Sequence, residues 1–433
     1  MLSREQNDLI TQTGPGTPCG DLLRSYWQPI LTAEELPPGA APMPVRVMSE
    51  ELVLYRNEDG SLGLLGLYCP HRGTDLSYGR IEDGGLRCLY HGWLFNEKGA
   101  CLDQPAEKGG GAFKDKIRHV AYPVREMGGL IFAYMGKGEP PLIPNYNFLT
   151  APEDYRIAFR VLQDCNWVQA MEGSIDPAHT SFLHRITPQA KRVQGEDKPA
   201  GNHADYFGED TCPDLEIERT RFGVRICTLR NLERGERYLR VTNYLYPNGA
   251  TVVGAETAQN AGGYSGRWYV PIDDHTHMRF ELLHVTDEPI DKAMFRSRRA
   301  KEIGPDNRHL RSAANRYLQN RDEMKTQTFA GLGRYFPAQD ALAIETPGAI
   351  YDRSQEHLGR SDMAVVQMRR ALLDAIEQMQ AGSEAPGLLR KPEDNLFPDL
   401  MVFGDFIEPG LTGPEFCARR LKQMGVAGES VVA

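Results

Sequence analysis

The stretch CPHRGTDLSYGRIEDGGLRCLYHGW, residues 69–93, contains two cysteine–histidine pairs separated by a polar spacer with several glycines. Cys69 and His71 form the first pair, and Cys88 and His91 form the second. Each pair sits where a strand-like run meets a turn that contains glycine, so the tips of two loops can converge. Cysteine and histidine are ligands for transition metals, and the pattern therefore predicts one metal centre held by both loops.

Three interpretations of these four residues compete. They could be unrelated core residues, although four potential ligands at these spacings seldom coincide. They could form a structural zinc site, whose usual spacing places the two cysteines together and the two histidines together. Here each half contains one of each, which suits a Rieske [2Fe–2S] cluster, where two thiolates hold one iron and two imidazoles hold the other. The sequence favours the Rieske cluster over the structural zinc site.

The composition of the 433-residue chain limits the classes of protein to consider. Hydrophobic residues make up 41% of it, enough for sizeable cores and, at this length, two domains. Its 59 acidic and 49 basic residues give a formal charge of −10, which argues against a nucleic-acid partner. The polar start MLSREQNDLITQTGPG and the lack of a long apolar run predict no membrane span. The eight scattered cysteines are not a disulfide framework, so we expect free thiols in a cytoplasmic protein.

The character of the sequence changes near residue 155. Before it, short strand-like runs alternate with turn signals such as EDG and DGG, which predicts an all-β unit. Residues 138–155, GEPPLIPNYNFLTAPEDY, show no hydrophobic periodicity and indicate a linker. Beyond it, strand-like runs mix with helical ones, and 361–382 has the clearest helical periodicity. We therefore predict an α+β protein with domains at 1–155 and 156–433.

A second group of potential ligands lies in CNWVQAMEGSIDPAHTSFLH, residues 165–184. Asp176, followed by proline, has the features of a helix N-cap, which would place His179 in the first turn of a helix. His179 and His184 are five residues apart, about 140° around an ideal helix, so a shared metal requires the turn to distort or end. Two histidines and one carboxylate form the facial triad of mononuclear non-haem iron(II), which leaves positions open for dioxygen and substrate. The alternative is a capped helix with two incidental histidines.

Taken together, the motifs resemble those of a known family. CPH followed by CLYHGW is the two-loop signature of Rieske proteins, and a D-x-x-H-x-x-x-x-H run and a QDALAIE segment follow it. This order is similar to that of the large subunit of Rieske non-haem iron aromatic-ring-hydroxylating oxygenases, in the phthalate 4,5-dioxygenase-like group. The resemblance extends from GPGTPCGDLLRSYWQPI to the helix after Asp362. Quinol-oxidising Rieske proteins carry loop-bridging cysteines and a serine where this chain has Thr74, Tyr90 and Trp93, which favours the oxygenase branch and a lower-potential cluster.

The resemblance implies further site residues. Asp340, in the segment FPAQDALAIETPGAIYDRSQEHLGRSD (336–362), occupies the position of the third iron ligand, with Glu345 as the competing carboxylate. Asp176 occupies the position of an aspartate that links the mononuclear iron site to the Rieske cluster of a neighbouring chain in a head-to-tail trimer. Glu172 stands where some relatives carry asparagine, which leaves the surroundings of Asp176 open.

Arg240 matches an arginine of phthalate-oxygenase relatives. On the strand-like run ERYLRVTNYLY (236–246), Arg240, Thr242 and Tyr244 alternate onto one face, where they could line a substrate pocket. The planar fork of an arginine suits the carboxylate of an aromatic acid. A surface salt bridge is the alternative role for Arg240.

The resemblance implies an N-terminal all-β Rieske [2Fe–2S] domain and a C-terminal helix-grip domain with a curved antiparallel sheet. A flavin- and iron–sulfur-containing reductase would supply electrons from NADH, since the sequence has no strand–GxGxxG–helix unit of its own. The cluster would reduce a mononuclear Fe(II), which uses O₂ to cis-dihydroxylate an aromatic acid of the phthalate, chlorobenzoate or phenoxybenzoate type. The expected assembly is a homotrimer or stacked trimers. The alternatives are a monooxygenase or O-demethylase of an aromatic ether, and a Rieske electron carrier without oxygenase activity.

Overall fold

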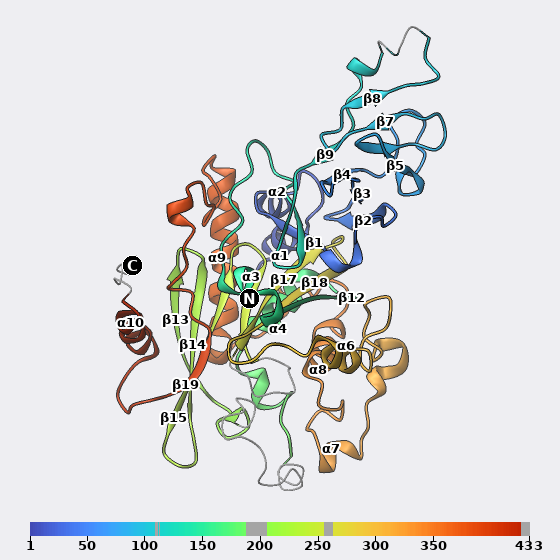
Figure 1. Cartoon of the computed structure of the whole chain (residues 1–433). Coiled ribbons are helices and arrows are strands. Elements are labelled where there is room, and N and C mark those ends of the chain that lie inside the picture. The colour runs from blue at the N-terminus through green and yellow to red at the C-terminus, as the bar shows by residue number, and fades with distance from the viewer. Residues whose placement is uncertain (109–110, 112, 188–205, 255–262, 426–433) are drawn as a thin grey trace.

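The structure is a computed structural model that describes residues 1–433 with the exception of 109–110, 112, 188–205, 255–262 and 426–433. In the described residues, three small antiparallel sheets form the N-terminal part and one large antiparallel sheet forms the C-terminal part (Figure 1). Helices pack mainly against the large sheet. The predicted α+β class with an all-β N-terminal unit is confirmed.

The N-terminal sheets consist of short strands joined by tight turns. The strands pair in the orders β1–β11–β10, β2–β3–β4–β9 and β5–β6–β7–β8. Their bounds are β1 Gln28–Thr32, β2 Met43–Val47, β3 Glu50–Arg56, β4 Leu62–Gly66, β5 Arg80–Glu82, β6 Gly85–Arg87, β7 Leu94–Phe95, β8 Cys101–Asp103, β9 Ala121–Tyr122, β10 Val124–Met127 and β11 Leu130–Ala133. Figure 1 shows β5, β7 and β8 in a lobe that projects from the body of the molecule. This lobe has a small hydrophobic cluster of its own, which includes Val53, Leu65, Cys69 and Cys88.

The large sheet has the strand order β12–β18–β17–β16–β15–β14–β13, and β19 pairs with β15 at its side. The bounds of its strands are β12 Arg156–Gln163, β13 Asp214–Thr220, β14 Gly223–Asn231, β15 Arg237–Leu245, β16 Gly249–Val253, β17 Gly263–Pro271, β18 His277–Val285 and β19 Phe403–Ile407. Sequence neighbours pair through most of this sheet, as expected for hairpin-connected antiparallel strands.

Helices cover both faces of β14. The α-helices of the described chain are α1 Arg4–Thr11, α2 Pro18–Arg24, α3 Asn147–Thr150, α4 Trp167–Ile175, α6 Lys292–Arg299, α7 Glu323–Thr326, α8 Phe336–Glu345, α9 Met363–Gln380 and α10 Gly413–Gln423. Ile226 of β14 shares a hydrophobic cluster with Leu372 of α9, whereas the adjacent Cys227 shares one with Phe416 of α10. Successive side chains of a strand point to opposite faces, so α9 and α10 lie on opposite sides of β14.

The most periodic helix of the sequence is present as α9. It lies inside the predicted range 361–382 and ends two residues before Gly382, whose φ is +88°. A left-handed residue after the last turn is a common way to end a helix. The segment 138–155 is more ordered than a plain linker, because it contains α3, where Phe148 and Leu149 are buried.

The N-terminal helices belong to the core of the C-terminal part. A single hydrophobic cluster contains Leu22 of α2, Trp167 of α4 and Leu372 of α9. Residues from both sides of residue 155 therefore share one core, and the domain boundary at that position stays a prediction.

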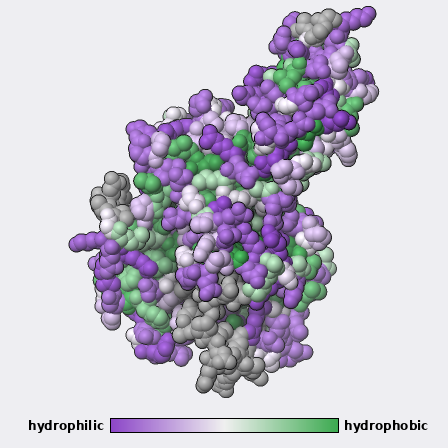
Figure 2. All heavy atoms as spheres, viewed as in Figure 1, coloured by the Kyte–Doolittle hydropathy of each residue, from purple (hydrophilic) through white to green (hydrophobic). Residues whose placement is uncertain are grey.

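The face of the molecule seen in Figure 2 is mostly hydrophilic, with smaller hydrophobic areas between the polar ones. Within the part of the chain that the structure describes, no helix has the length and apolar character needed to cross a membrane.

Candidate metal centres

The two cysteine–histidine loops have the same local structure. In the first loop, the Gly73 N–H donates to the Cys69 carbonyl at 2.8 Å, and the Cys69 N–H donates to the Thr74 carbonyl at 2.8 Å. In the second loop, the Gly92 N–H donates to the Cys88 carbonyl at 3.1 Å, and the Cys88 N–H donates to the Trp93 carbonyl at 2.8 Å. Both glycines have φ near +75°, namely +74° and +76°, which other residues adopt at a cost. The repeated turn gives both loops the same geometry, as two halves of one site require.

The side chains of the two loops meet. The ring centroids of His71 and His91 are 4.6 Å apart, and His71 stacks on Trp93 at 4.5 Å. The Nδ1 atom of His91 is buried and has no hydrogen-bond partner in the described structure. Burial raises the pKa of the Cys69 thiol to about 11, and the neighbouring Cys88 contributes to this increase. A thiolate at Cys69 therefore requires a metal ion. This donor set fits a [2Fe–2S] cluster with one thiolate and one imidazole from each loop.

A second set of ligand atoms converges in the C-terminal part. His179, His184 and Asp340 each contribute one ligand atom to a group in which all atoms lie within 4.8 Å of one another. The Nε2 atoms of the two histidines are 3.3 Å apart, and Asp340 Oδ1 lies 3.1 Å from His184 Nε2 and 3.6 Å from His179 Nε2. Burial alone would raise the pKa of the Asp340 carboxyl, but the two imidazoles hold it well below its ordinary value. Two imidazoles and an ionised carboxylate fit a mononuclear iron(II) site.

The chain bends sharply to bring the two histidines together. His179 begins a one-turn 3₁₀ helix, η5, which spans His179–Ser181, and His184 follows after it. The expectation that the turn must end between the histidines is therefore met. Asp340 comes from α8, where Phe336, one turn earlier, stacks on the His184 ring at 4.3 Å.

Glu345, the competing carboxylate, lies elsewhere. It is five residues beyond Asp340 on α8, which places it about 140° around the helix. Its carboxylate accepts a hydrogen bond from the Tyr317 hydroxyl at 2.9 Å and one from the Asp164 N–H at 3.4 Å. The structure brings Asp340, and not Glu345, to the histidine pair.

Gln339 is a site residue that the sequence did not single out. Its Oε1 lies 2.7 Å from Nδ1 of His184, and its Nε2 donates to the Gly333 carbonyl at 2.6 Å. Because the amide oxygen accepts, His184 Nδ1 carries the proton and Nε2 is left with a lone pair for a metal. The only signal in the sequence is its place directly before Asp340, which does not separate it from any other polar residue of a helix.

Asp176 is not a helix N-cap, contrary to the expectation from the Asp-Pro pair. The helix before it, α4, begins at Trp167 behind an Asn166 cap, and Asp176 is the residue after its last turn. The Asp176 Oδ1 accepts from the Ala178 N–H at 2.7 Å, and Oδ2 lies 3.6 Å from His179 Nδ1. Although burial opposes it, the His179 imidazole lowers the pKa of Asp176. The Asp176 carboxylate thus lies beside the Nδ1 atom of His179, on the other side of the ring from Nε2, without a hydrogen bond between them in the described structure.

Arg240 is buried, not a surface residue. Its side chain is 7% exposed, and burial lowers its pKa to about 10. The Nη2 atom lies 3.4 Å from the Val253 carbonyl, while Nε has no partner in the described structure. Its guanidinium carbon lies 5.1 Å from the centre of the Phe207 ring. Tyr244, on the same face of β15, donates its hydroxyl proton to the Pro247 carbonyl at 2.7 Å, so that hydroxyl already has an acceptor.

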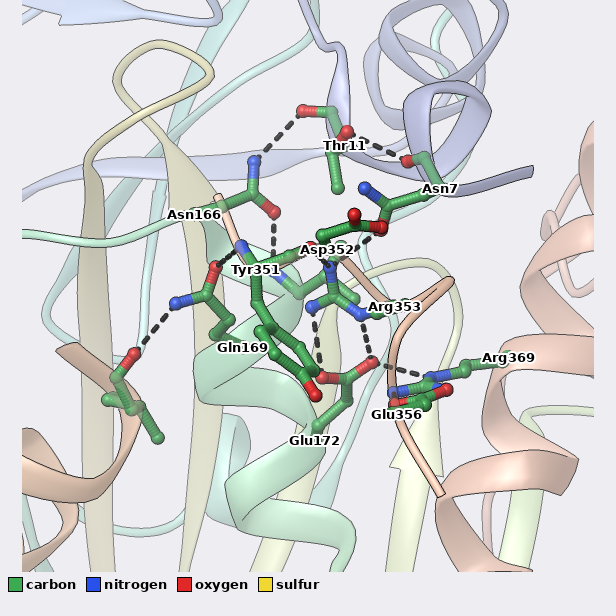
Figure 3. Close-up of polar contacts among 12 residues, drawn as sticks. Asn7, Thr11, Asn166, Gln169, Glu172, Tyr351, Asp352, Arg353, Glu356 and Arg369 are labelled. Atoms are coloured by element: carbon green, nitrogen blue, oxygen red, sulfur yellow. Dashed lines mark hydrogen bonds and ion pairs between the residues drawn. The ribbon is translucent and has the colours of Figure 1, made fainter. Parts of the chain in front are cut away.

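Glu172 belongs to a buried ion network (Figure 3). Its carboxylate accepts from Arg353 at 2.7 and 2.9 Å and from Arg369 at 2.6 Å. Arg369 also pairs with Glu356, and Arg353 donates to Asn7 at 3.0 Å. The network joins α1, α4, the segment before α9, and α9 itself. Glu172 therefore ties α4 to α9 and to the segment before α9.

Comparisons with known proteins agree with this arrangement. The chain matches the Rieske [2Fe-2S] domain family over residues 26–123 and the LigXa C-terminal domain like family over residues 133–405. It is 36% identical to the phthalate 4,5-dioxygenase oxygenase subunit of Pseudomonas putida over 89% of each chain. It is 33% identical to the 5,5'-dehydrodivanillate O-demethylase oxygenase subunit of Sphingobium sp., over 96% of this chain and 90% of that one. It is 32% identical to the 3-chlorobenzoate-3,4-dioxygenase oxygenase subunit of Comamonas testosteroni, over 89% and 91%.

Solved structures share the fold. Dicamba monooxygenase bound to dicamba has a TM-score of 0.58 at 18% identity, covering 83% of this chain and 99% of that one. The oxygenase of carbazole 1,9a-dioxygenase in its reduced complex with ferredoxin has a TM-score of 0.56 at 20% identity, covering 90% and 99%. The chain belongs to the Rieske non-haem iron oxygenases, as an oxygenase subunit of the ring-hydroxylating type. Its cofactors are a Rieske [2Fe–2S] cluster and a mononuclear iron.

Proposed function

We propose that this chain is the oxygenase component of a dioxygenase that cis-dihydroxylates an aromatic acid. Cys69 and Cys88 hold one iron of the cluster, and His71 and His91 hold the other. The observation that carries the proposal is the convergence of His179, His184 and Asp340, since the cluster alone would also suit an electron carrier. When bound, the cluster supplies electrons and the mononuclear iron supplies the activation of O₂.

The residues around the second site prepare it for the metal. Asp340 is ionised and needs no proton loss on binding, because its pKa is held well below the ordinary value by the imidazoles. Gln339 keeps the proton of His184 on Nδ1, and Phe336 covers one face of the same ring. With three protein ligands, the remaining coordination positions are left for O₂ and the approach of substrate.

Arg240 is the group that would hold an acidic substrate. It is buried, it carries a positive charge at neutral pH, and its charge interacts electrostatically with both His179 and Asp340. A buried guanidinium that lacks a carboxylate partner in the described structure favours an anionic ligand. The phthalate and 3-chlorobenzoate dioxygenases among the relatives are named for aromatic acids, which agrees with this role.

A second candidate function is O-demethylation of an aromatic ether. It is supported by the 33% identity to the dehydrodivanillate O-demethylase subunit, whose named substrate is also an aromatic acid. The same metal site can serve both reactions, because the outcome depends on which substrate atom lies nearest the iron. The buried arginine therefore supports an acidic substrate in either case.

The chain works with an electron-transfer partner, as oxygenase subunits of this type do. In our proposal the partner is an NADH-dependent reductase with flavin and an iron–sulfur centre. The assembly is a homotrimer, or stacked trimers, in which Asp176 lies between His179 of its own chain and a cluster histidine of a neighbouring chain. Figure 1 supports the need for a neighbour, because the lobe with β5, β7 and β8 projects from the top of the molecule, whereas helix α8 lies in the lower half of its body. Head-to-tail contacts of this kind close into a ring when the rotation is threefold.

A single-turnover experiment tests the proposed reaction without the reductase. The chemically reduced holoprotein is mixed with ¹⁸O₂ and, in separate samples, with phthalate, 3-chlorobenzoate and a methoxylated aromatic acid. We expect a diol that carries both labelled oxygen atoms from one of the first two acids. If the methoxylated acid instead yields formaldehyde and a phenol, the reaction is O-demethylation and not dioxygenation. If the cluster is reoxidised but the protein contains no mononuclear iron, the chain functions only as an electron carrier.

A further inference from the structure

The buried side chain of Arg230 connects the large sheet to the turn that carries His179. Arg230 is on β14 and is 0% exposed. Its Nη2 donates to the Pro177 carbonyl at 2.8 Å and to the Thr180 hydroxyl at 3.0 Å, and it lies 3.5 Å from the Ser181 hydroxyl. These three acceptors lie on both sides of His179 in the sequence. One guanidinium nitrogen thus contacts acceptors near both ends of the turn from Pro177 to Ser181.

The hydrogen bonds within the turn are local and do not tie it to the sheet: the Ser181 N–H donates to the Ala178 carbonyl at 3.1 Å, and the Leu183 N–H donates to the His179 carbonyl at 2.8 Å. The helix α4 ends at Ile175, and η5 is a single 3₁₀ turn, which has poorer hydrogen-bond geometry than an α-helix. The Pro177 carbonyl accepts from Arg230 and from the Thr180 hydroxyl, the latter at 2.8 Å. Without Arg230, the position of this turn against the sheet would rest on these local contacts and on the bond from Ser181 to the Asp210 carbonyl at 3.2 Å.

Burying the charged side chain of Arg230 in the core costs free energy. In the part of the chain that the structure describes, it forms no ion pair, and its Nε and Nη1 atoms have no hydrogen-bond partner. Burial lowers its pKa to about 10, so it is still charged at neutral pH. Hydrophobic side chains of similar volume fill a core at least as well as a buried charge does. The neutral oxygens of the turn, and the Phe207 ring 5.4 Å from the guanidinium carbon, offset part of this cost.

We propose that Arg230 is a positioning residue for the mononuclear iron site: it fixes the 177–181 turn so that the His179 Nε2 atom meets the Nε2 atom of His184 and the carboxylate of Asp340. It reaches this turn from the face of β14 that also carries Thr228, the residue paired with Arg240 on β15. The sheet that presents the substrate-binding arginine therefore also holds an iron ligand in place. This inference rests on the proposed iron triad.

The test measures how tightly the holoprotein keeps its mononuclear iron. Arg230→Lys keeps the charge and loses the fork, and Arg230→Gln loses the charge. Each variant is titrated with a chelator, the mononuclear iron is followed by the EPR signal of its nitric oxide complex, and the cluster is followed by its visible absorbance. Loss of a group that orients a metal ligand weakens metal binding by about 10- to 100-fold. We expect a loss in this range for both variants, with a changed EPR line shape and an unchanged cluster.

Arg225→Lys is the matched control. Arg225 lies on the same strand and is 6% exposed, but it pairs with Glu218 at 3.0 Å and has its side chain on the opposite face. We expect this control to retain iron like the wild type, even where its thermal stability falls. Folded Arg230 variants with iron affinity within about twofold of the wild type would overturn the inference.

Two further variants keep the test decisive. If both Arg230 variants fail to fold, Thr180→Val removes one acceptor of the arginine with nearly the same volume. It should weaken iron retention in the same direction by a smaller factor, and unchanged retention would reject the role of Arg230. Asp340→Ala distinguishes failure of the role of Arg230 from failure of the proposed iron triad. If it releases the iron and the Arg230 variants do not, only the inference fails, whereas iron retained in Asp340→Ala would remove the triad itself.

Discussion

The Nδ1 atom of His184 lies 2.7 Å from the amide oxygen of Gln339, the residue directly before Asp340. Two consecutive residues of α8 therefore act on the same histidine, since Asp340 Oδ1 lies 3.1 Å from its Nε2. One side chain sets the tautomer of His184, and the next offers a carboxylate at the opposite side of the ring. This relationship makes α8 the element that completes the proposed iron site.

Replacing Gln339 should weaken the mononuclear site without removing any ligand. In Gln339→Leu, His184 loses the acceptor for its Nδ1 proton, and we expect iron to bind about 10- to 100-fold more weakly. Iron content after dialysis against a chelator measures this loss. Gln169→Leu is a control, because Gln169 is also buried but donates to the Ile344 and Gly348 carbonyls. Equal iron loss in both variants would mean that the effect comes from general loosening of the fold.

Asp340 and Glu345 provide a direct test of the third ligand. Asp340→Ala should lose the mononuclear iron and turnover while the cluster keeps its visible absorbance, because the cluster ligands lie in the separate lobe. Glu345→Gln should retain both metal centres, since that carboxylate accepts from Tyr317 instead. Iron analysis of the two variants decides the matter, and retention of full mononuclear iron in Asp340→Ala would require another carboxylate.

Asp176→Asn should separate the charge of this residue from its structural role. Asparagine can still accept the Ala178 N–H, so we expect normal folding and a cluster that dithionite reduces. It cannot accept charge-assisted hydrogen bonds from imidazoles on both sides, so turnover should nearly vanish. Stopped-flow reoxidation of the reduced cluster in the presence of substrate and O₂ measures the transfer step. Near-normal turnover would leave Asp176 as a local turn residue.

Arg240→Gln should discriminate between acidic and neutral substrates. A hydrogen bond to a charged group contributes about 1.5–3 kcal/mol, which corresponds to about 10- to 100-fold in binding. We expect KM to rise by about this factor for an aromatic acid and to change little for its neutral amide. Arg237→Gln, on the same strand but bonded to the Leu411 carbonyl, should change neither value. An equal effect on the acid and the amide would remove the carboxylate-binding role.

Glu172→Gln should reduce stability and change its dependence on pH. Breaking a buried ion network by removal of one partner costs about 3–5 kcal/mol, and Glu172 faces two arginines. Burial opposes ionisation, but Arg353 and Arg369 lower the pKa of Glu172 below 4.5, so its contribution is present above pH 4.5 and is lost as pH falls through the folded-state pKa. Urea denaturation at neutral and acidic pH should show a large difference in unfolding free energy between wild type and variant at pH 7, and this difference should shrink as the pH falls below 4.5.

An exposed ion pair is the control for this experiment. Glu384 pairs with Arg390 at the surface, where its side chain is 57% exposed. Glu384→Gln should change the free energy of unfolding by about 0–1 kcal/mol at most. A Glu172→Gln variant that is no less stable than this control would show that the network does not hold α4.

The first metal site was predictable from the sequence because its geometry is local. Cys69 and His71, and likewise Cys88 and His91, are held within single turns whose hydrogen bonds run between residues four or five apart. Residue spacing alone therefore constrains where the side chains lie. The order of the motifs indicated the family and predicted that Asp340 joins the two histidines, and the helical period located α9. These features depend on neighbours along the chain or on a known pattern.

Only the tertiary structure decided the rest. The Asp-Pro pair at 176 has the local features of a helix start, yet α4 had begun earlier, where Asn166 caps it and the apolar side chains of Trp167, Val168 and Met171 are buried. Gln339 approaches His184 from 155 residues away, and Arg230 crosses from a strand to a turn about fifty residues before it. A buried polar side chain is stabilised by whichever acceptor packing brings to it. The sequence contains those polar residues, but packing of α4 and α8 against the large sheet determines which of them meet.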